Sequence, residues 1–187
     1  MLTRRFFLTA TLLAATGLAS GANAASAVEA YVSTVGNSVL AAARANSVAK
    51  FRSLLRANAD IPAIALFSLG AYRKSLTKNV QAEYFKLVED YIANVFTSHA
   101  SQLAGDSLEV VGSQNTGDSV LVKTKVSYSG GRTVPVTWRI VKRGGGYKIF
   151  DVNVDGIWLA TTQKTNFVTV LKKNKGDINA LLAYLRA

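Results

Sequence analysis

The chain has 187 residues, of which 49% are hydrophobic and 18% are charged, and its formal net charge is +11. The length indicates one domain after processing, and the apolar fraction is ample for a hydrophobic core. There is no cysteine, which excludes disulfides and thiolate metal sites. The basic balance favours anionic partners, namely nucleic acid, a membrane surface or an acidic protein.

The first 24 residues have the pattern of a secretory signal peptide. A short positive segment with Arg4 and Arg5 precedes an apolar run over residues 9–19, and Ala22-Asn23-Ala24 is a small-x-small cleavage site. The run is too short to span a bilayer. The sequence Thr-Arg-Arg-Phe-Phe-Leu resembles the twin-arginine export signal, and an ordinary Sec signal is the open alternative. We therefore expect a periplasmic protein that begins at Ala25, with a net charge of 11 − 2 = +9, for which nucleic acid is not an expected partner.

Helical spacing of apolar residues dominates the chain up to residue 105. The predicted helices cover residues 26–44, 48–55, 61–69 and 78–103. Asp60 fits the N-cap of the third helix, with Pro62 in its first turn, and Thr77 fits the cap of the fourth. The third helix is too apolar for a free surface, which predicts that it is buried or lines a cavity.

From residue 108 the apolar period changes to two, which is typical of β-strands. Strands are predicted over residues 108–113, 119–128 and 132–142, and the turn at residues 143–146 leads into a fourth. Three sets of residues are each expected to share one face of a strand: Val120, Val122, Thr124, Val126 and Tyr128; Val134, Val136, Trp138 and Ile140; and Phe150, Val152 and Val154. Short turns join the four strands in an antiparallel meander.

The fourth strand turns through Asp155-Gly156 into an amphipathic helix over residues 157–173, and a last helix covers residues 177–186. Helices before and after this four-stranded antiparallel meander predict an α+β fold. We expect one domain over residues 25–187. Its helical half covers residues 25–105, and the sheet and the C-terminal helices cover residues 106–187.

Several segments carry a family resemblance. They are Asp60-Ile61-Pro62 with Ala65, Leu69-Gly70 and Tyr72-Arg73; the run Tyr147-Lys148-Ile149-Phe150-Asp151-Val152; and Val154-Asp155-Gly156-Ile157-Trp158-Leu159 followed by Gln163-Lys164-Thr165-Asn166-Phe167. The chain resembles the MlaC/toluene-tolerance family of periplasmic phospholipid-binding proteins, including its hopanoid-associated relatives. Family members often carry an arginine near the start of the last long helix, where this chain reads Gln163-Lys164, and Trp158 stands where a small residue is more usual.

The resemblance implies a soluble shuttle of an ABC-transporter-linked lipid trafficking system. Such a shuttle carries phospholipid between an outer-membrane lipoprotein complex and an inner-membrane ABC transporter complex. The resemblance also implies a twisted antiparallel four-stranded meander sheet packed with helices around an apolar lipid pocket, which holds the acyl chains of the phospholipid and leaves its headgroup outside. A hopanoid or other lipid carrier of the same fold is the alternative. The resemblance implies no catalytic residue, no metal and no cofactor.

The candidates for the pocket wall are large apolar side chains from both halves of the chain: Phe67, Tyr72, Tyr84, Val88, Tyr91, Ile92, Val126, Trp138, Ile140, Phe150, Val152, Ile157 and Phe167. Taken singly, each of them is more simply explained as core, and the resemblance favours the set as a pocket. A second set is basic and predicts transient contact with an anionic membrane surface or with acidic partners: Arg73, Lys74, Lys123, Lys125, Arg139, Lys142, Arg143, Lys148, Lys172, Lys173 and Lys175. A solvated face is the simpler explanation for each of these residues.

An enzyme on a cone-shaped α+β scaffold and a structural adaptor are the competing classes. The enzyme candidates are Asp151, Asp155, Asp90, Glu83 and His99. Asp151 and Asp155 lie four apart on a strand, roughly 13 Å at ~3.3 Å per residue, which is farther than the paired carboxylates of glycosidases. His99 has neither a nucleophile motif nor a second histidine at ligand spacing. We therefore predict a lipid carrier without catalysis.

Overall fold

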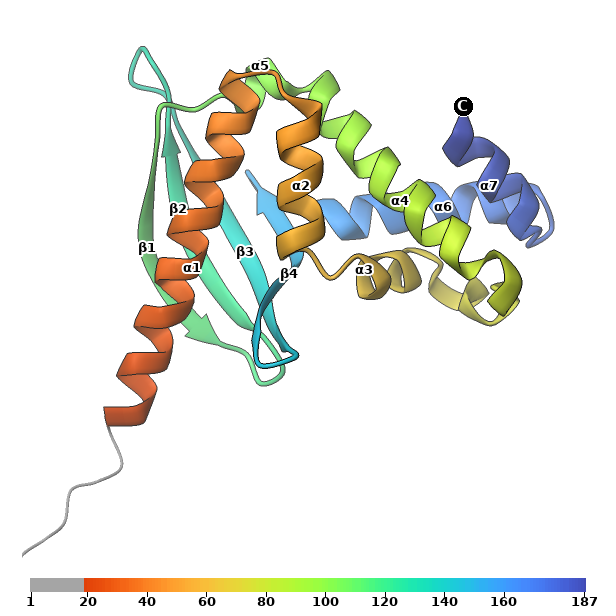
Figure 1. The fold of residues 1–187 in the computed structure, drawn as a ribbon, viewed down its shortest axis with the longest axis horizontal. Coiled ribbons are helices and arrows are strands. Elements are labelled where there is room, and N and C mark those ends of the chain that lie inside the picture. Colours follow the sequence, from red (N-terminus) through yellow and green to blue (C-terminus); the bar gives the residue numbers. More distant parts are fainter. Residues whose placement is uncertain (1–18) are drawn as a thin grey trace, which may run out of the picture.

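The computed structural model describes the backbone of residues 19–187 and the side chains of residues 26–187 (Figure 1). The signal peptide predicted over residues 1–24 lies outside the residues whose side chains are described. The helices are α1 (Ala19–Arg44), α2 (Val48–Asn58), α3 (Ile61–Ser68), the 3-10 helix η1 (Gly70–Ser75), α4 (Lys78–Ser98), α5 (Ala100–Leu103), α6 (Leu159–Lys173) and α7 (Ile178–Arg186). The strands are β1 (Ser107–Asn115), β2 (Val120–Ser127), β3 (Thr133–Arg143), β4 (Gly146–Val154) and β5 (Ile157–Trp158). Within the described residues, no helix combines the length and hydropathy that a membrane span requires.

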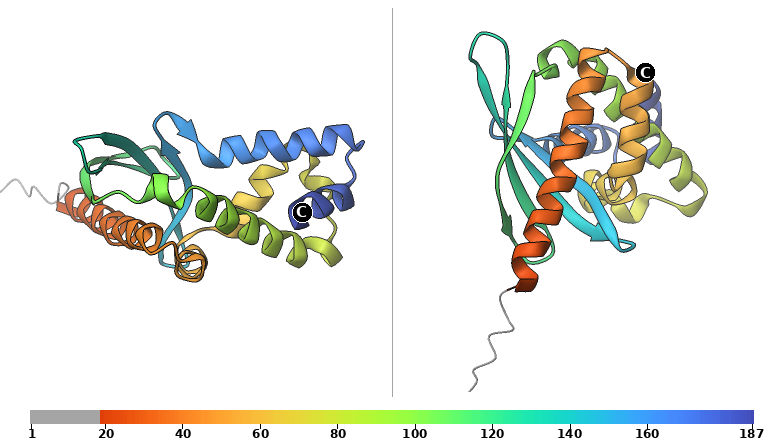
Figure 2. Two further views of the ribbon diagram at one scale, coloured as in Figure 1. Left: turned by 90° about the horizontal axis from the view of Figure 1, so that it is seen from above. Right: turned by 60° about the vertical axis from the view of Figure 1, so that its left-hand side comes forward.

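The five strands form one antiparallel sheet in the order β1-β2-β3-β4-β5. In β2 the side chains of Val122, Thr124 and Val126 are buried and those of Lys123 and Lys125 are exposed. The side chains alternate because successive residues of a strand point to opposite faces, and the predicted faces of β2 and β3 are confirmed. Helix α1 lies along the buried face of the sheet, as the views in Figure 2 show.

A bulge in β4 corrects the prediction for that strand. Arg139 pairs with Asp151 and Ile140 pairs with Ile149, so the register shifts at this point and Phe150 is an extra residue. A bulge of this kind breaks the two-residue alternation of side chains. Ile149 packs with the residues under α1, but Phe150 contacts helix α3 instead. The prediction that Phe150 shares a face with the later valines of β4 is therefore wrong.

A fifth strand corrects the predicted count of four. Asp155 and Gly156 have φ values of 50° and 88°, and Val154 pairs with Ile157 across them. Two residues with positive φ form the tight hairpin turn that antiparallel strands favour. The chain therefore returns along β4 as strand β5, and helix α6 begins at Leu159 and not at residue 157.

Helices α3, η1, α4, α6 and α7 form the end of the molecule away from the sheet (Figure 1). Asp60 caps α3 as predicted, and its side chain accepts a hydrogen bond from the N–H of Ala63 at 3.3 Å. Thr77 stands at the N-cap of α4, but its hydroxyl contacts the side chain of Asn79 and makes no capping hydrogen bond. The η1 helix was not predicted.

The helix predicted over residues 78–103 is interrupted at His99, which separates α4 from α5. Thr97 and Ser98 donate side-chain hydrogen bonds to the carbonyls four residues earlier, and Nδ1 of His99 lies 2.9 Å from the carbonyl oxygen of Val95. Such side-chain contacts with the preceding turn compete with the helical hydrogen bonds and bend helices. Three consecutive polar side chains therefore contact the preceding turn at the point where α4 ends.

The buried apolar side chains form two large clusters and one smaller cluster. The helical cluster joins α3, α4, α6 and α7 and contains Ala65, Leu69, Tyr84, Val88, Phe167, Leu171, Ile178, Leu181, Leu182 and Leu185. The sheet cluster joins α1 to the inner face of the sheet and contains Val28, Val32, Leu40, Val122, Val126, Val134, Val136, Trp138 and Ile140. The smaller cluster joins α1, α2 and α4. Ten of the thirteen predicted pocket residues belong to these two large clusters or pack against them.

Candidate functional site

Six of the predicted pocket residues belong to the helical end. Tyr84, Val88 and Phe167 are completely buried members of the helical cluster. Tyr72, Tyr91 and Ile92 are half-buried and pack against it. The hydroxyl of Tyr84 donates a hydrogen bond to the carbonyl oxygen of Ala65 at 2.8 Å, and burial raises the pKa of Tyr84 well above its ordinary value. The six residues are brought together in a packed cluster.

Four further residues of the prediction lie on the sheet. Val126, Trp138 and Ile140 are buried members of the sheet cluster, and Val152 is half-buried and packs against it. Nε1 of Trp138 donates a hydrogen bond to Oγ1 of Thr124 at 3.0 Å, and that hydroxyl donates in turn to the carbonyl oxygen of Val136 at 3.0 Å. The two polar groups in this apolar cluster are therefore satisfied by each other and by the backbone.

Phe67 of α3 and Phe150 of β4 lie at the boundary between the two ends of the molecule. Their ring centroids are 5.5 Å apart in an edge-to-face arrangement, which is favourable for aromatic pairs. The ammonium of Lys164 lies 4.9 Å from the centroid of the Phe67 ring. Ile157, the last residue of the predicted set, is 58% exposed on β5 and belongs to neither large cluster. The bulge in β4 is what directs Phe150 towards α3.

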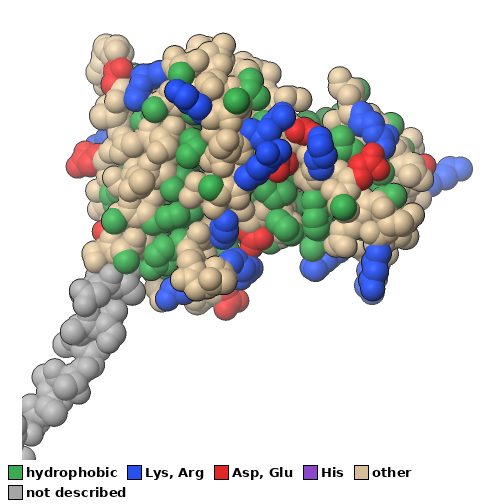
Figure 3. All heavy atoms as spheres, in the orientation of Figure 1, with side chains coloured by type: hydrophobic (Ala, Val, Ile, Leu, Met, Phe, Trp, Pro, Cys, Tyr) green, Lys and Arg blue, Asp and Glu red, His purple; other side chains and the backbone are tan. Residues whose placement is uncertain are grey.

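In Figure 3, hydrophobic side chains appear on the surface over the sheet and at the junction with the helical end. The described part of the surface has two hollows. One has a volume of about 660 Å³ and lies between α1 and α2, lined by Ser38, Ala41, Ala42, Ala49, Lys50, Ser53, Leu54 and Ala57. The other, of about 370 Å³, is lined by Arg56, Ala59, Asp60, Ile61, Pro62, Glu89, Arg143 and Lys148. Neither hollow is lined by a residue of the predicted set, so the acyl-chain pocket stays a prediction.

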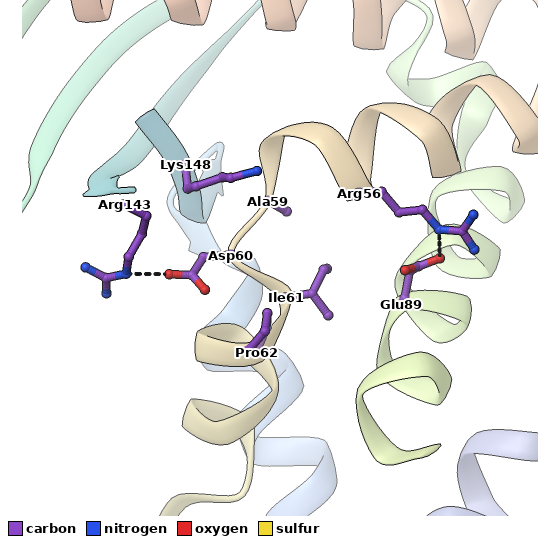
Figure 4. A pocket seen from close by; sticks show the side chains of 8 residues that line it. All are labelled: Arg56, Ala59, Asp60, Ile61, Pro62, Glu89, Arg143 and Lys148. Carbon is purple, nitrogen blue, oxygen red and sulfur yellow. Dashed lines mark hydrogen bonds and ion pairs between the residues drawn. The ribbon is translucent and has the colours of Figure 1, made fainter. Parts of the chain in front are cut away.

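The smaller hollow contains charged side chains that are paired with each other (Figure 4). Nε of Arg143 donates to Oδ2 of Asp60 at 2.8 Å, and Nε of Arg56 donates to Oε1 of Glu89 at 2.7 Å. Nζ of Lys148 donates to a backbone carbonyl at the end of α2. Figure 4 shows the guanidinium groups of Arg143 and Arg56 on opposite sides of the α2–α3 connection, so they do not converge on one ligand position.

Strand β4 meets the start of α6 at a buried carboxylate. Asp151 is 4% exposed, and its Oδ1 accepts hydrogen bonds of 2.8 Å from the N–H groups of Val152 and Ala160. Burial raises the pKa of the Asp151 carboxyl, although those two N–H groups and the charge of Arg139 act in the opposite direction. Arg139 also stacks over the Trp158 ring at 4.4 Å.

Two side chains that each carry a buried nitrogen atom without a hydrogen-bond partner among the described residues were missed by the sequence prediction. Gln163, on the inner face of α6, is 8% exposed, and its Nε2 has no hydrogen-bond partner among the described residues. Arg52 of α2 forms an ion pair with Asp90, and its Nε likewise lacks a partner in the described part of the chain. A polar residue on the inner face of an amphipathic helix was the available signal for Gln163.

The remaining enzyme candidates are explained by local structure. Asp90 forms ion pairs with Arg52 and Lys86, and Glu83 pairs with Arg186. Asp155 forms the β4–β5 turn. No group of three or more His, Cys, Asp or Glu side chains that could hold a metal occurs among the described residues. These contacts bring no candidate nucleophile and base together.

The comparisons with known proteins fit this architecture. A phospholipid-binding protein from Ralstonia solanacearum, solved in complex with a phospholipid, superposes with a TM-score of 0.73 at 21% sequence identity, covering 84% of this chain and 94% of that chain. This likeness establishes the fold. No curated protein gives a significant match to the sequence. The sequence model of the MlaC protein family matches residues 26–187. The chain therefore belongs to the MlaC family.

Proposed function

We propose that the protein binds phospholipid and holds its acyl chains in an apolar pocket. The observation that carries the proposal is the membership of the MlaC family over residues 26–187. The fold shared with a phospholipid complex over 84% of the chain supports it. The proposal involves no catalysis and no cofactor, because the acidic side chains described above are used in ion pairs, caps and turns.

The acyl chains lie between the helical cluster and the sheet cluster in this proposal. Phe67 and Phe150 meet at that boundary, and the predicted wall residues lie on both sides of it. Insertion of hydrocarbon requires the two rings to separate, so that the chains replace the contact between α3 and β4. Each CH₂ group removed from water contributes ~0.8 kcal/mol, and two long chains therefore supply enough free energy for such a separation.

We further propose that the protein is a periplasmic shuttle of an ABC-transporter-linked phospholipid system. Its partners are then an inner-membrane transporter complex and an outer-membrane lipoprotein complex. The predicted signal peptide supports export, and the family resemblance of the sequence supports the trafficking function. A hopanoid or another lipid as the cargo would use the same apolar space.

Extraction of the purified protein with organic solvent, followed by mass spectrometry, tests the proposal. We expect phospholipid in a molar ratio near one to the protein, and the spectrum also identifies a hopanoid cargo if there is one. The control is a sample that is treated with detergent, denatured and then extracted in the same way. It measures lipid that is carried over from the preparation without being bound by the folded protein. Repeated recovery of folded protein without lipid, and without uptake from added phospholipid, contradicts the proposal.

A further inference from the structure

The end of the molecule formed by η1, the start of α4 and the turn between α6 and α7 carries an unusual concentration of positive charge. We call it the basic tip, and its cations are Arg73, Lys74, Lys78, Lys172, Lys173 and Lys175. All six side chains are exposed, and none forms an ion pair within the described residues. Figure 3 shows Lys and Arg side chains around this end of the molecule, at the right of the view.

The segments of the basic tip are held together by direct contacts. A Cβ placed on Gly176 would lie 3.1 Å from the ring of Tyr72, so the α6–α7 turn packs against η1. The only carboxylate within the same segments is Asp177, which accepts a hydrogen bond from the N–H of Asn179 at the start of α7. The tip therefore carries five of the net positive charges of a chain whose total is +11.

Local stability does not explain this concentration of charge. Lys172 and Lys173 are in the last turn of α6, where cations complement the helix dipole. Lys78, in contrast, is the first residue of α4, and a cation at a helix N-terminus is unfavourable. The exposed cations of η1 and of the α6–α7 turn have no anionic partner among the described residues that would offset their mutual repulsion.

We propose that the basic tip docks on the surface of an anionic phospholipid bilayer. Five of the six cations are lysines, whereas the energetically dominant residues of protein–protein interfaces are mostly Trp, Tyr and Arg. The lysines of the tip are spread over several segments, and this arrangement suits a broad anionic surface. Each lysine then adds to the binding free energy through the negative surface potential and needs no fixed partner. The proposal goes beyond lipid binding in the interior, and neither depends on the other.

Sedimentation with phospholipid vesicles tests the docking surface. The sample is the purified protein in the form that the cell produces after processing. We expect binding to vesicles of phosphatidylglycerol mixed with phosphatidylcholine at low salt and loss of that binding in 1 M salt, where the Debye length is about 3 Å. Vesicles of phosphatidylcholine alone should not bind. The triple variant Lys172→Glu, Lys173→Glu, Lys175→Glu should lower the partition coefficient by at least about 100-fold, since the loss of each cation near an anionic surface costs about a factor of five and the new carboxylates are repelled by that surface.

A matched control separates a local docking surface from total charge. The triple variant Lys123→Glu, Lys125→Glu, Arg132→Glu removes the same charge from exposed positions at the sheet end, and it should lower the partition coefficient less than tenfold. A second tip variant, Arg73→Glu, Lys74→Glu, Lys78→Glu, should behave like the first. Circular dichroism and the copurified lipid are measured for each variant, so that loss of docking is distinguished from misfolding and from loss of cargo. Equal effects of the tip and sheet variants, equal binding to both kinds of vesicle, or no binding by the unaltered protein would overturn the proposal.

Discussion

Asp151 of β4 caps helix α6 from outside the helix, because its Oδ1 accepts a hydrogen bond from the N–H of Ala160 at 2.8 Å. The residue at the N-cap position itself, Trp158, provides no side-chain hydrogen bond. The first turn of a helix has unsatisfied N–H groups, and a cap supplies one of the missing acceptors. This one carboxylate therefore links strand β4 to the first turn of α6.

We expect Asp151→Ala to lower the free energy of unfolding by about 1–2 kcal/mol, because a buried N–H group at the start of α6 loses its acceptor. Asp151→Asn keeps an acceptor oxygen at the same position and should cost clearly less. Urea unfolding followed by circular dichroism gives both values. A larger loss for the Asn variant than for the Ala variant would contradict a capping function.

The pH dependence of stability should report the buried carboxyl of Asp151. Its pKa is raised in the folded state, so the folded protein holds the proton more tightly than the unfolded chain. The resulting stabilisation is fully present below about pH 3.9, the pKa of an ordinary aspartate, and is lost as the pH rises through the raised folded value. Relative to Asp151→Asn, the unaltered protein should gain stability as the pH falls from 7 towards 4. Parallel unfolding free energies of the two proteins over this range would show that the carboxyl does not titrate as described.

The pair of Trp138 and Thr124 should show energetic coupling in the sheet cluster. Thr124→Val removes the acceptor of the buried indole N–H, and leaving that donor unsatisfied should cost about 1–3 kcal/mol. In a protein that already carries Trp138→Phe, the same substitution should cost less, because no indole donor remains. Unfolding free energies of the two single variants and the double variant measure the coupling. Additive losses would mean that the hydrogen bond contributes nothing beyond the separate side chains.

The sheet was predictable where one face is buried and the other exposed. In β2 and β3 buried, mostly apolar residues alternate with exposed or half-buried ones, such as Val122 with Lys123 and Val136 with Thr137, and this alternation indicates both the strand and its inner face. The cap at Asp60 is likewise local, since its side chain accepts a hydrogen bond from the N–H group three residues later. These features depend on neighbours in the sequence, and sequence reasoning therefore recovers them.

The features that were missed depend on contacts between distant segments. The bulge at Phe150 is defined by the pairing of β4 with β3, and it brings Phe150 against Phe67 of α3. The alternation of residues along β4 does not encode it. Strand β5 has only two residues and is defined by its pairing with β4. The division of the pocket residues between two clusters has the same origin, because apolar residue type alone does not say which cluster a side chain joins.

A close approach at Gly105 should make that position intolerant of any side chain. A Cβ there would lie 2.3 Å from Cγ1 of Val126 and 3.2 Å from the carbonyl oxygen of Ser127. Because valine has a stiff side chain and the backbone cannot move freely, Gly105→Ala should cost about 1–3 kcal/mol. At Gly36 the obstacle is the flexible end of Leu108, 2.5 Å from the Cβ position, and Gly36→Ala should cost less. Thermal unfolding compares the two variants, and an equal loss would contradict this distinction.

The aromatic contact between Phe67 and Phe150 is where the phospholipid proposal can be tested by substitution. Both side chains are half-buried, and we propose that both contact the acyl chains once the rings separate. Phe67→Ala and Phe150→Ala should each lower the copurified phospholipid several-fold, because each removes aromatic surface that shelters hydrocarbon from water. Quantitative mass spectrometry of the extracted lipid measures the change, and circular dichroism confirms that each variant is folded. Val111→Ala, at a position that is 63% exposed on β1, is the matched control and should leave the lipid content unchanged. Folded variants of both phenylalanines with undiminished phospholipid would place the acyl chains elsewhere in the protein.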